Sequence, residues 1–292
     1  MQLMKRILEA RSAYFFILPA YFFFVVFTLL PLLQGLQFSF YDVKLTSRTW
    51  VGLDNFIGLY QDPVFWKALT NTVVLVVGIV PAAMAISLFI AVIVYPLGRG
   101  LQTFFRMAFY MPIVASGVAL SLVWLWILNP TYGLLNYVLG LLGAGPVAWL
   151  GTPNMALLTV DMVVITMIVG QPVILYIAAL GGIPRDLYES AMIDGAGAWR
   201  QFRSITLPLL KPTTLFVLVT QTIGVFQVFV VIHLMTGGGP AHGTQTIVYR
   251  MYQTGFDFFN FGTASALGVV LILLVSVVAW AQFKWLGQET EY

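Results

Sequence analysis

Residues 183–212 read IPRDLYESAMIDGAGAWRQFRSITLPLLKP, a polar stretch between two long apolar segments. The chain around it has 292 residues, of which 60% are hydrophobic and 9% are charged. Since an ordinary soluble domain is about 45–50% apolar and about 25% charged, this composition excludes a soluble globular protein. The 23 Phe, 13 Tyr and 8 Trp residues also exclude a disordered chain, because that much apolar surface does not stay in water. We therefore expect an all-α membrane protein.

Six segments are apolar and long enough to cross a bilayer as helices, which takes about 20 residues each. They lie near residues 13–38, 72–95, 107–128, 156–180, 213–235 and 262–285. These spans predict a single transmembrane domain over residues 13–292, preceded by a short segment, residues 1–12. The first span is longer than the roughly 7–15 apolar residues of a signal peptide and has no evident cleavage site, so we expect it to be retained.

An even number of spans puts both termini on one side of the membrane, and the basic residues indicate which side. Ten of them flank one face, namely Lys5, Arg6, Arg11, Arg99, Arg106, Arg185, Arg200, Arg203, Lys211 and Lys284. The other face has Lys44, Arg48, Lys67 and Arg250. By the positive-inside rule, the face with ten cations is cytoplasmic, and so are both termini. Residues 41–69 and 129–154 are then external.

The quoted stretch between the fourth and fifth spans is far longer than the roughly 2–8 residues of an ordinary helix connection. Pro184 suits the first turn of a helix and Gly195 suits its end, so we expect a short helix over residues 185–194. A second helical stretch is expected from Ala198 until Pro208 breaks it. A rigid cytoplasmic helix joined at both ends to membrane spans can carry a partner's displacement into the bilayer. The alternative is an amphipathic connector that only lies on the membrane surface.

This stretch resembles the EAA loop of ATP-binding-cassette importer permeases. The matching residues are Glu189, Ser190, Ala191, Asp194, Gly195, Ala196, Phe202, Ile205, Leu207, Pro208 and Pro212, with Ser190 in place of the usual first Ala. In that family the loop is a coupling helix that docks in a cleft on a separate ATPase subunit. The resemblance implies a coupling loop over residues 184–212, in which Glu189 pairs with a basic residue of the ATPase and Asp194 and Gly195 shape the turn.

Further fragments resemble the carbohydrate branch of these permeases, and more narrowly the first permease of a maltose-type or glycerol-phosphate-type pair. They are VGLDNF (51–56), DPVFW (62–66), NT (71–72), LMTGGGP (234–240), Thr244 and YQTGF (252–256). The resemblance implies the type I importer fold, a sugar-class substrate and a bacterial inner-membrane location. It also implies a homologous second permease, two ATPase subunits, and a sugar-binding protein that docks on residues 41–69 and 236–261.

The chain shows no means of hydrolysing ATP by itself. A phosphate-binding loop needs a Gly-Lys pair, and none of the five Lys residues follows a Gly. We therefore expect no enzyme, no catalytic residues and no bound cofactor or metal, with ATP and Mg²⁺ used by the partner ATPase. The absence of Cys excludes disulfides, thiolate zinc sites and cysteine nucleophiles. The net charge of +3 is small, so nucleic-acid binding is not indicated.

An ion-coupled secondary transporter is the main alternative, because such proteins work through ionisable groups within the membrane. Among Asp, Glu and His, only Asp161 and His233 fall within the predicted spans. Asp161 either lies near the positive end of a helix that enters from outside, or contacts the substrate or the binding protein. His233 is expected to be an interface residue hydrogen-bonded to the nearby chain. A third alternative, an intramembrane enzyme, lacks a catalytic set such as H-E-x-x-H or G-x-S-x-G.

Sugars are neutral and rich in hydroxyls, so their sites need amide, hydroxyl and aromatic partners. In the fifth span, Thr213, Thr220, Gly224 and Gln227 fall on one helical face, which predicts a substrate contact at Gln227. The alternative is ordinary helix packing through small and polar residues. Gln171, beside Pro172, and Trp124 are further candidates. The exact sugar, or a glycerol-phosphate or polyol in its place, stays open.

Overall fold

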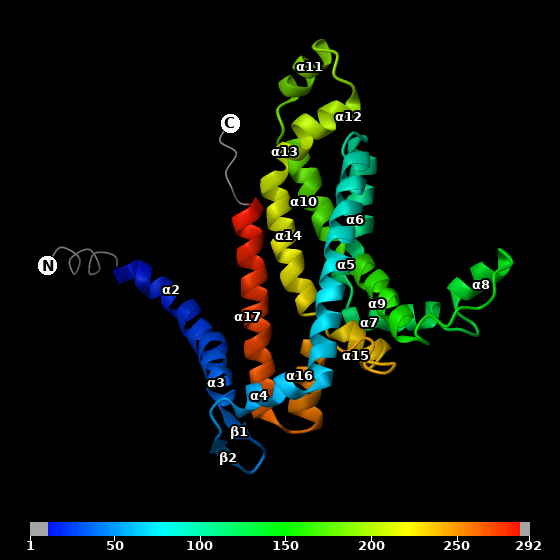
Figure 1. Cartoon of the computed structure of the whole chain (residues 1–292). Coiled ribbons are helices and arrows are strands. Elements are labelled where there is room, and N and C mark those ends of the chain that lie inside the picture. Colours follow the sequence, from blue (N-terminus) through cyan, green and yellow to red (C-terminus); the bar gives the residue numbers. More distant parts are fainter. Residues whose placement is uncertain (1–10, 287–292) are drawn as a thin grey trace. The chain divides into compact units, whose positions relative to one another are not determined.

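The computed structural model describes residues 11–286, with side chains from residue 15 onward (Figure 1). The contacts divide the chain into two compact units, residues 1–61 with 251–270 and residues 62–250 with 271–292. Most of the predicted cytoplasmic N-terminus, residues 1–12, lies outside the described residues. The prediction of one transmembrane domain over residues 13–292 stays a prediction.

The first unit consists of helices and one short antiparallel hairpin. Its elements are α2 (Arg11–Phe24), the π-helical turn η1 (Val25–Leu29), α3 (Leu30–Phe38), β1 (Tyr41–Val43), β2 (Arg48–Trp50), α4 (Asp54–Gln61), the π-helical turn η3 (Gln253–Asp257) and the first turns of α17 (Phe261–Leu286). In the hairpin Tyr41 pairs with Trp50 and Val43 with Arg48. The Arg48 guanidinium lies over the rings of Tyr41 and Phe38, so it ties the hairpin to the end of α3.

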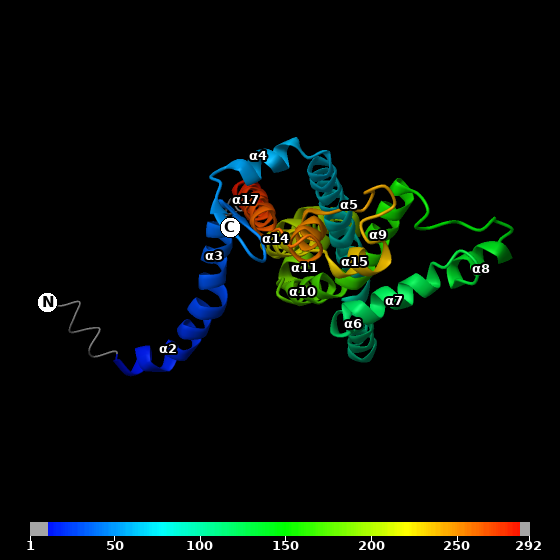
Figure 2. The ribbon, with the colours of Figure 1, turned by 90° about the horizontal axis from the view of Figure 1, so that it is seen from below.

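The second unit is all helical in its described residues and contains most of the chain. Its elements are α5 (Pro63–Val94), α6 (Arg99–Val114), α7 (Gly117–Ile127), α8 (Leu134–Leu141), α9 (Pro153–Ile168), α10 (Gly170–Gly181), α11 (Arg185–Ile193), α12 (Ala198–Gln201), η2 (Phe202–Thr206), α13 (Leu207–Leu209), α14 (Lys211–Phe226), α15 (Val230–Met235), α16 (Ile247–Tyr252) and the rest of α17. Helix α5 packs against α9, α10 and α14, and α10 also packs against α6. Figure 2 shows α7 and α8 leading away from these packed helices.

The core of the second unit lies where α5, α10 and α14 meet. Val173, Tyr176 and Ile177 of α10 are buried there against Ala83 of α5 and Val217 of α14. Leu210, just before α14, is also fully buried in this cluster. The segment between α10 and α14 is therefore attached at both ends to this buried cluster.

Four helical stretches are long and apolar enough to cross a membrane: Phe15–Phe38, Pro63–Val94, Lys211–Met235 and Phe261–Leu286. Two further pairs qualify only as bent spans, α6 with α7 at 98° and α9 with α10 at 46°. If each pair is one span, the described residues contain six, as the apolar segments predict. The expectation of an all-α membrane fold is confirmed.

The structure differs from a straight helix in the predicted third span, residues 107–128. Ala115 and Ser116 both have extended backbone, with ψ of 148° and 130°, and they turn the chain sharply between α6 and α7. A hydropathy profile does not show such a break, because apolar residues such as Val114 and Val118 lie on both sides of it. The second helical span also begins earlier than the predicted residue 72, at Pro63, where Asp62 accepts a hydrogen bond from the backbone N–H of Val64.

Candidate functional site

Helix α11 carries the residues matched to the coupling loop, and its C-terminus has a well-defined cap. Gly195 adopts a left-handed conformation, with φ of 75°. The N–H of Ala196 donates to the Ala191 carbonyl at 2.8 Å, and the N–H of Gly195 donates to the Met192 carbonyl at 3.0 Å. This bond pair is a Schellman cap, which a residue with a Cβ fits poorly at the left-handed position. The Asp194-Gly195 sequence therefore ends the helix at a defined position.

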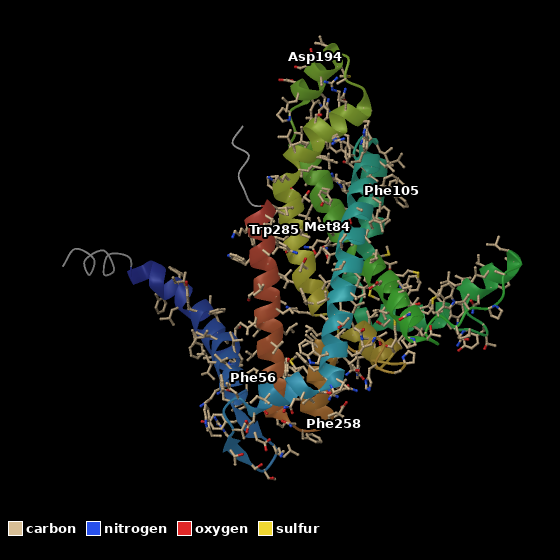
Figure 3. All side chains as sticks on the ribbon, viewed as in Figure 1. Phe56, Met84, Phe105, Asp194, Phe258 and Trp285 are labelled. Carbon is tan, nitrogen blue, oxygen red and sulfur yellow. The ribbon has the colours of Figure 1, made fainter. Side chains whose placement is uncertain are left out.

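The structure places most of the matched residues on the surface of this loop. Glu189, Ser190, Asp194 and Gly195 are exposed, whereas Ala191, Ala196, Phe202 and Pro208 are half-buried. Figure 3 shows Asp194 at the far end of the second unit, beyond α10 and α14. Around the polar residues the loop exposes large apolar side chains, including Ile193 at 87% and Trp199 at 71%. An exposed apolar surface with a polar rim is typical of a protein-interaction site.

A hydrogen bond joins α11 to the segment that leads into the next span. The hydroxyl of Tyr188 on α11 lies 2.8 Å from Oγ1 of the buried Thr206, and η2 leads through α13 into α14. On the other side of the cap, Gln201 Nε2 donates to the Ala196 carbonyl at 2.8 Å. Sequence reasoning missed Tyr188, Thr206 and Gln201, because nothing in their spacing signals a contact 18 residues apart. Because of the Tyr188–Thr206 hydrogen bond, a rotation of α11 would exert a force on η2.

The polar stripe of the fifth span is only partly continuous. Thr220 and Gly224 are exposed on α14, as the shared face predicts, but the helix ends at Phe226. Gln227 lies in a turn, where its N–H donates to the Gly224 carbonyl at 3.1 Å, before the chain resumes a helix at Val230. The expectation that Gln227 extends the same helical face is therefore wrong. Its side chain is nonetheless exposed beside a break in the span.

The bend in the fourth span is built around Pro172. Because proline has no N–H, the Ile168 carbonyl loses its helical donor, and Gln221 Nε2 of α14 approaches it at 3.5 Å. Next to it, Ser87 Oγ of α5 lies 3.0 Å from the Val169 carbonyl oxygen. The predicted candidate, Gln171, is exposed instead. The glutamine that reaches the bend is therefore Gln221, on a different helix.

Asp161 is a half-buried carboxylate that faces α5. Its Oδ1 is buried and has no hydrogen-bond partner among the described residues. A Cβ on Gly78 of α5 would lie only 2.8 Å from its Oδ2, so a glycine makes room for the carboxylate. Helix α9 begins at Pro153, so Asp161 lies in its third turn, and both interpretations of this carboxylate stay predictions.

The two remaining candidates are His233 and Trp124. The His233 ring stacks on Phe229 at 5.1 Å between centroids and lies 5.9 Å from Tyr249. Trp124 is half-buried on α7, the helix that packs against α15. Among residues 11–286, no group of three or more His, Asp or Glu side chains could hold a metal ion.

Some of the sugar-branch fragments join separate segments of the second unit. Asn71 Nδ2 donates to the carbonyls of His242 at 2.9 Å and Gln245 at 3.0 Å, and Thr72 Oγ1 accepts from the Ile247 N–H at 3.1 Å. Arg250 forms an ion pair with Asp62, the residue that caps α5, at 3.1 Å. The NT fragment is therefore bonded, at the N-terminal half of α5, to residues 242–247, which follow the TGGGP fragment in the chain.

Comparison with known proteins places the chain among transport permeases. The family model described as "Binding-protein-dependent transport system inner membrane component" matches residues 83–291. The chain is 33% identical over 277 residues to the lactose transport system permease protein LacF of Rhizobium radiobacter, with 93% of each chain covered. It is 34% identical over 284 residues to the sn-glycerol-3-phosphate transport system permease protein UgpA of Brucella abortus, with 96% of each covered.

A solved structure agrees with these relatives. The crystal structure of a bacterial ABC transporter involved in the import of the acidic polysaccharide alginate matches with a TM-score of 0.88 and 26% sequence identity. The match covers 100% of both chains, so the whole fold is shared.

Proposed function

The chain belongs to the family of binding-protein-dependent transport system inner membrane components, and from this premise we propose how it works. It is a permease subunit of an ABC importer of the sugar and glycerol-phosphate class. The observation that carries this conclusion is the 33–34% identity to lactose and glycerol-3-phosphate permeases over more than nine-tenths of the chain. The resemblance of the chain to this branch is thereby confirmed.

The partners follow from the same family. The chain works with a homologous second permease, two copies of a cytoplasmic ATPase and a periplasmic sugar-binding protein. ATP and Mg²⁺ bind to the ATPase, and this chain supplies the pathway through the inner membrane rather than a reaction. The exposed apolar residues around Glu189 support a partner on the coupling loop.

The geometry suggests how ATPase motion enters the membrane. Closure of the ATPase pair moves α11, and the Tyr188–Thr206 hydrogen bond passes this displacement to η2 and α14. Since α14 packs on α5 and α10, a shift of α14 changes the pathway along its exposed face, at Thr220, Gly224 and the turn at Gln227. ATP hydrolysis then returns the loop to its starting position.

The coupling role is tested by Glu189→Lys in the assembled complex. We expect sugar uptake to be lost, with either ATPase activity that no longer responds to the binding protein or a loosened ATPase subunit. Wild-type assembly and uptake in Glu189→Lys reject the coupling role.

The substrate role is tested by Gln227→Leu. A neutral sugar needs the amide, so uptake should fall and the apparent affinity should weaken. Gln34→Leu, at an exposed position outside the predicted pathway and docking segments, serves as the matched control. Unchanged uptake and affinity for every transported sugar discard Gln227 as a contact. Gln171, Asp161 and Trp124 are the next variants in the same assay.

One alternative substrate and one alternative energy source remain as candidates. The glycerol-3-phosphate relatives favour a phosphorylated polyol as the alternative substrate, and binding of a panel of sugars and polyol phosphates to the cognate binding protein separates the two. An ion-coupled secondary transporter would use Asp161. Collapse of uptake by ionophores while ATP stays high would favour that mechanism.

A further inference from the structure

Helix α4 of the first unit has three distinct faces. Successive residues turn by about 100°, so Leu53, Ile57 and Tyr60 fall within about 60° of one another. They are 60%, 51% and 69% exposed. A second stripe, offset by about one residue, consists of the exposed Asp54, Gly58 and Gln61. The third face, which carries Phe56 and the buried Leu59, is packed against the protein.

The first unit also fixes where α4 begins. Asn55 Nδ2 donates to the carbonyls of Ser39 and Tyr41, both at 2.9 Å, just beyond the end of the first span at Phe38. Its Oδ1 accepts from Thr263 Oγ1 at 3.2 Å, at the start of the span Phe261–Leu286. One side chain thus joins the beginning of α4 to the outer ends of two spans. The helix therefore starts at the end of two spans, which the positive-inside orientation places at the outer boundary of the bilayer.

We propose that the stripe of Leu53, Ile57 and Tyr60 lies in the headgroup region of the outer leaflet and anchors the first unit to the lipid surface. A helix that carries an apolar stripe beside a polar one lies in the plane of the interface, with the apolar side chains inserted by about 5–10 Å. Tyrosine suits this depth, because its ring is apolar and its hydroxyl reaches water. Trp50 of β2, which is 65% exposed and stacked on Phe40, adds a second aromatic anchor.

The chemistry of the stripe favours lipid over a protein partner. The side chains of Leu53, Ile57 and Tyr60 carry no charge, and their only polar group is the Tyr60 hydroxyl. A soluble binding protein approaches from the water, and the side of α4 that carries Asp54 and Gln61 suits that approach. The proposal does not depend on which solute is transported, so it can fail without affecting the proposed function.

The chain contains no Cys, so single labels can be placed without background substitutions. The test uses Ile57→Cys on the apolar stripe and Gly58→Cys on the polar stripe, in the full complex in nanodiscs of phosphatidylcholine and phosphatidylglycerol. A Cβ at Gly58 meets no atom within 4 Å, and Ile57 is half-exposed, so both positions accept a nitroxide. Collision rates with oxygen, which concentrates in lipid, and with a water-soluble nickel chelate are then measured by electron paramagnetic resonance.

We expect the ratio of oxygen to nickel collisions to be severalfold higher at residue 57 than at residue 58, and to stay so when the binding protein is added. High nickel access at both positions overturns the proposal. So does a label at residue 57 that is shielded from both reagents, which means contact with the second permease. A label at residue 57 that is open to nickel until the binding protein shields it identifies a protein-docking surface and also overturns it.

Discussion

Asparagine side chains hold distant segments of this chain together where charged groups are scarce. Asn136 uses its full hydrogen-bonding capacity: Nδ2 donates to the carbonyls of Pro130 and Val147, and Oδ1 accepts from the Val147 N–H and from Trp149 Nε1. Asn71 plays the same part at the outer end of α5. An amide with two donors and one acceptor oxygen can join three backbone groups, which an ion pair cannot do.

Asn71→Leu should loosen the loop over residues 236–246. The change leaves the carbonyls of His242 and Gln245 without their amide donor, at a cost of about 1–3 kcal/mol for each buried group. We expect a lower Tm for the purified protein and faster hydrogen exchange in this loop. Thr70→Ala, one residue earlier, removes only a bond to its own helix at Trp66 and is the control. Equal exchange in the two variants would contradict the assigned role.

Gly170→Ala should be among the most damaging single-methyl changes. A Cβ at residue 170 would overlap the backbone carbonyl of Phe109 on α6, and backbone cannot yield as a flexible side chain does. Overpacking of this kind costs about 1–3 kcal/mol. The readout is the yield of monodisperse protein and its Tm. Gly140→Ala, where the added Cβ meets nothing within 4 Å, should behave like wild type, and a normal Gly170→Ala would refute the close contact.

At the scale of elements, length and apolarity predict that spans exist but not where they break. The bend at Pro172 has a visible sequence signal, because proline removes one helical donor. The turn at Ala115 and Ser116 and the end of α14 before Gln227 have no such signal, since these residues accept helix and extended backbone alike. The coupling helix could be predicted closely, because Pro184 and Gly195 mark its two ends.

Pro172→Ala should partly straighten the fourth span. The new N–H at residue 172 can bond to the Ile168 carbonyl, so the 46° bend between α9 and α10 should decrease. Spin labels at the exposed positions Leu158 and Ala178 report this as a longer distance, by about 2 Å for a fully straight helix at 1.5 Å per residue. Pro153→Ala, in the first turn of α9, should leave the distance unchanged. No lengthening in Pro172→Ala would assign the bend to packing against α5 and α6 instead.

At the scale of the whole molecule, the family and a predicted membrane topology can be inferred from the sequence more readily than individual side-chain contacts. Charge placement and apolar length act along the chain and can be read directly, whereas the partners of Tyr188, Asn71 and Asp161 are set by tertiary packing. The predicted pathway shows the difference. Thr220 and Gly224 share an exposed face because of helical periodicity. The position of Gln227 depends on where α14 ends, and no local sequence pattern predicts that end.

The positive-inside rule gives the last prediction, because it assigns a side of the membrane to every loop. In the chain without Cys, Leu45→Cys in the external hairpin should react with a membrane-impermeant maleimide in intact spheroplasts. Ala198→Cys, exposed in the coupling loop, should react only after the membrane is opened or in inverted vesicles. Both positions must label fully in detergent, which controls for accessibility. Labelling of Ala198→Cys from outside would invert the topology, and with it the side from which an ATPase could reach Glu189.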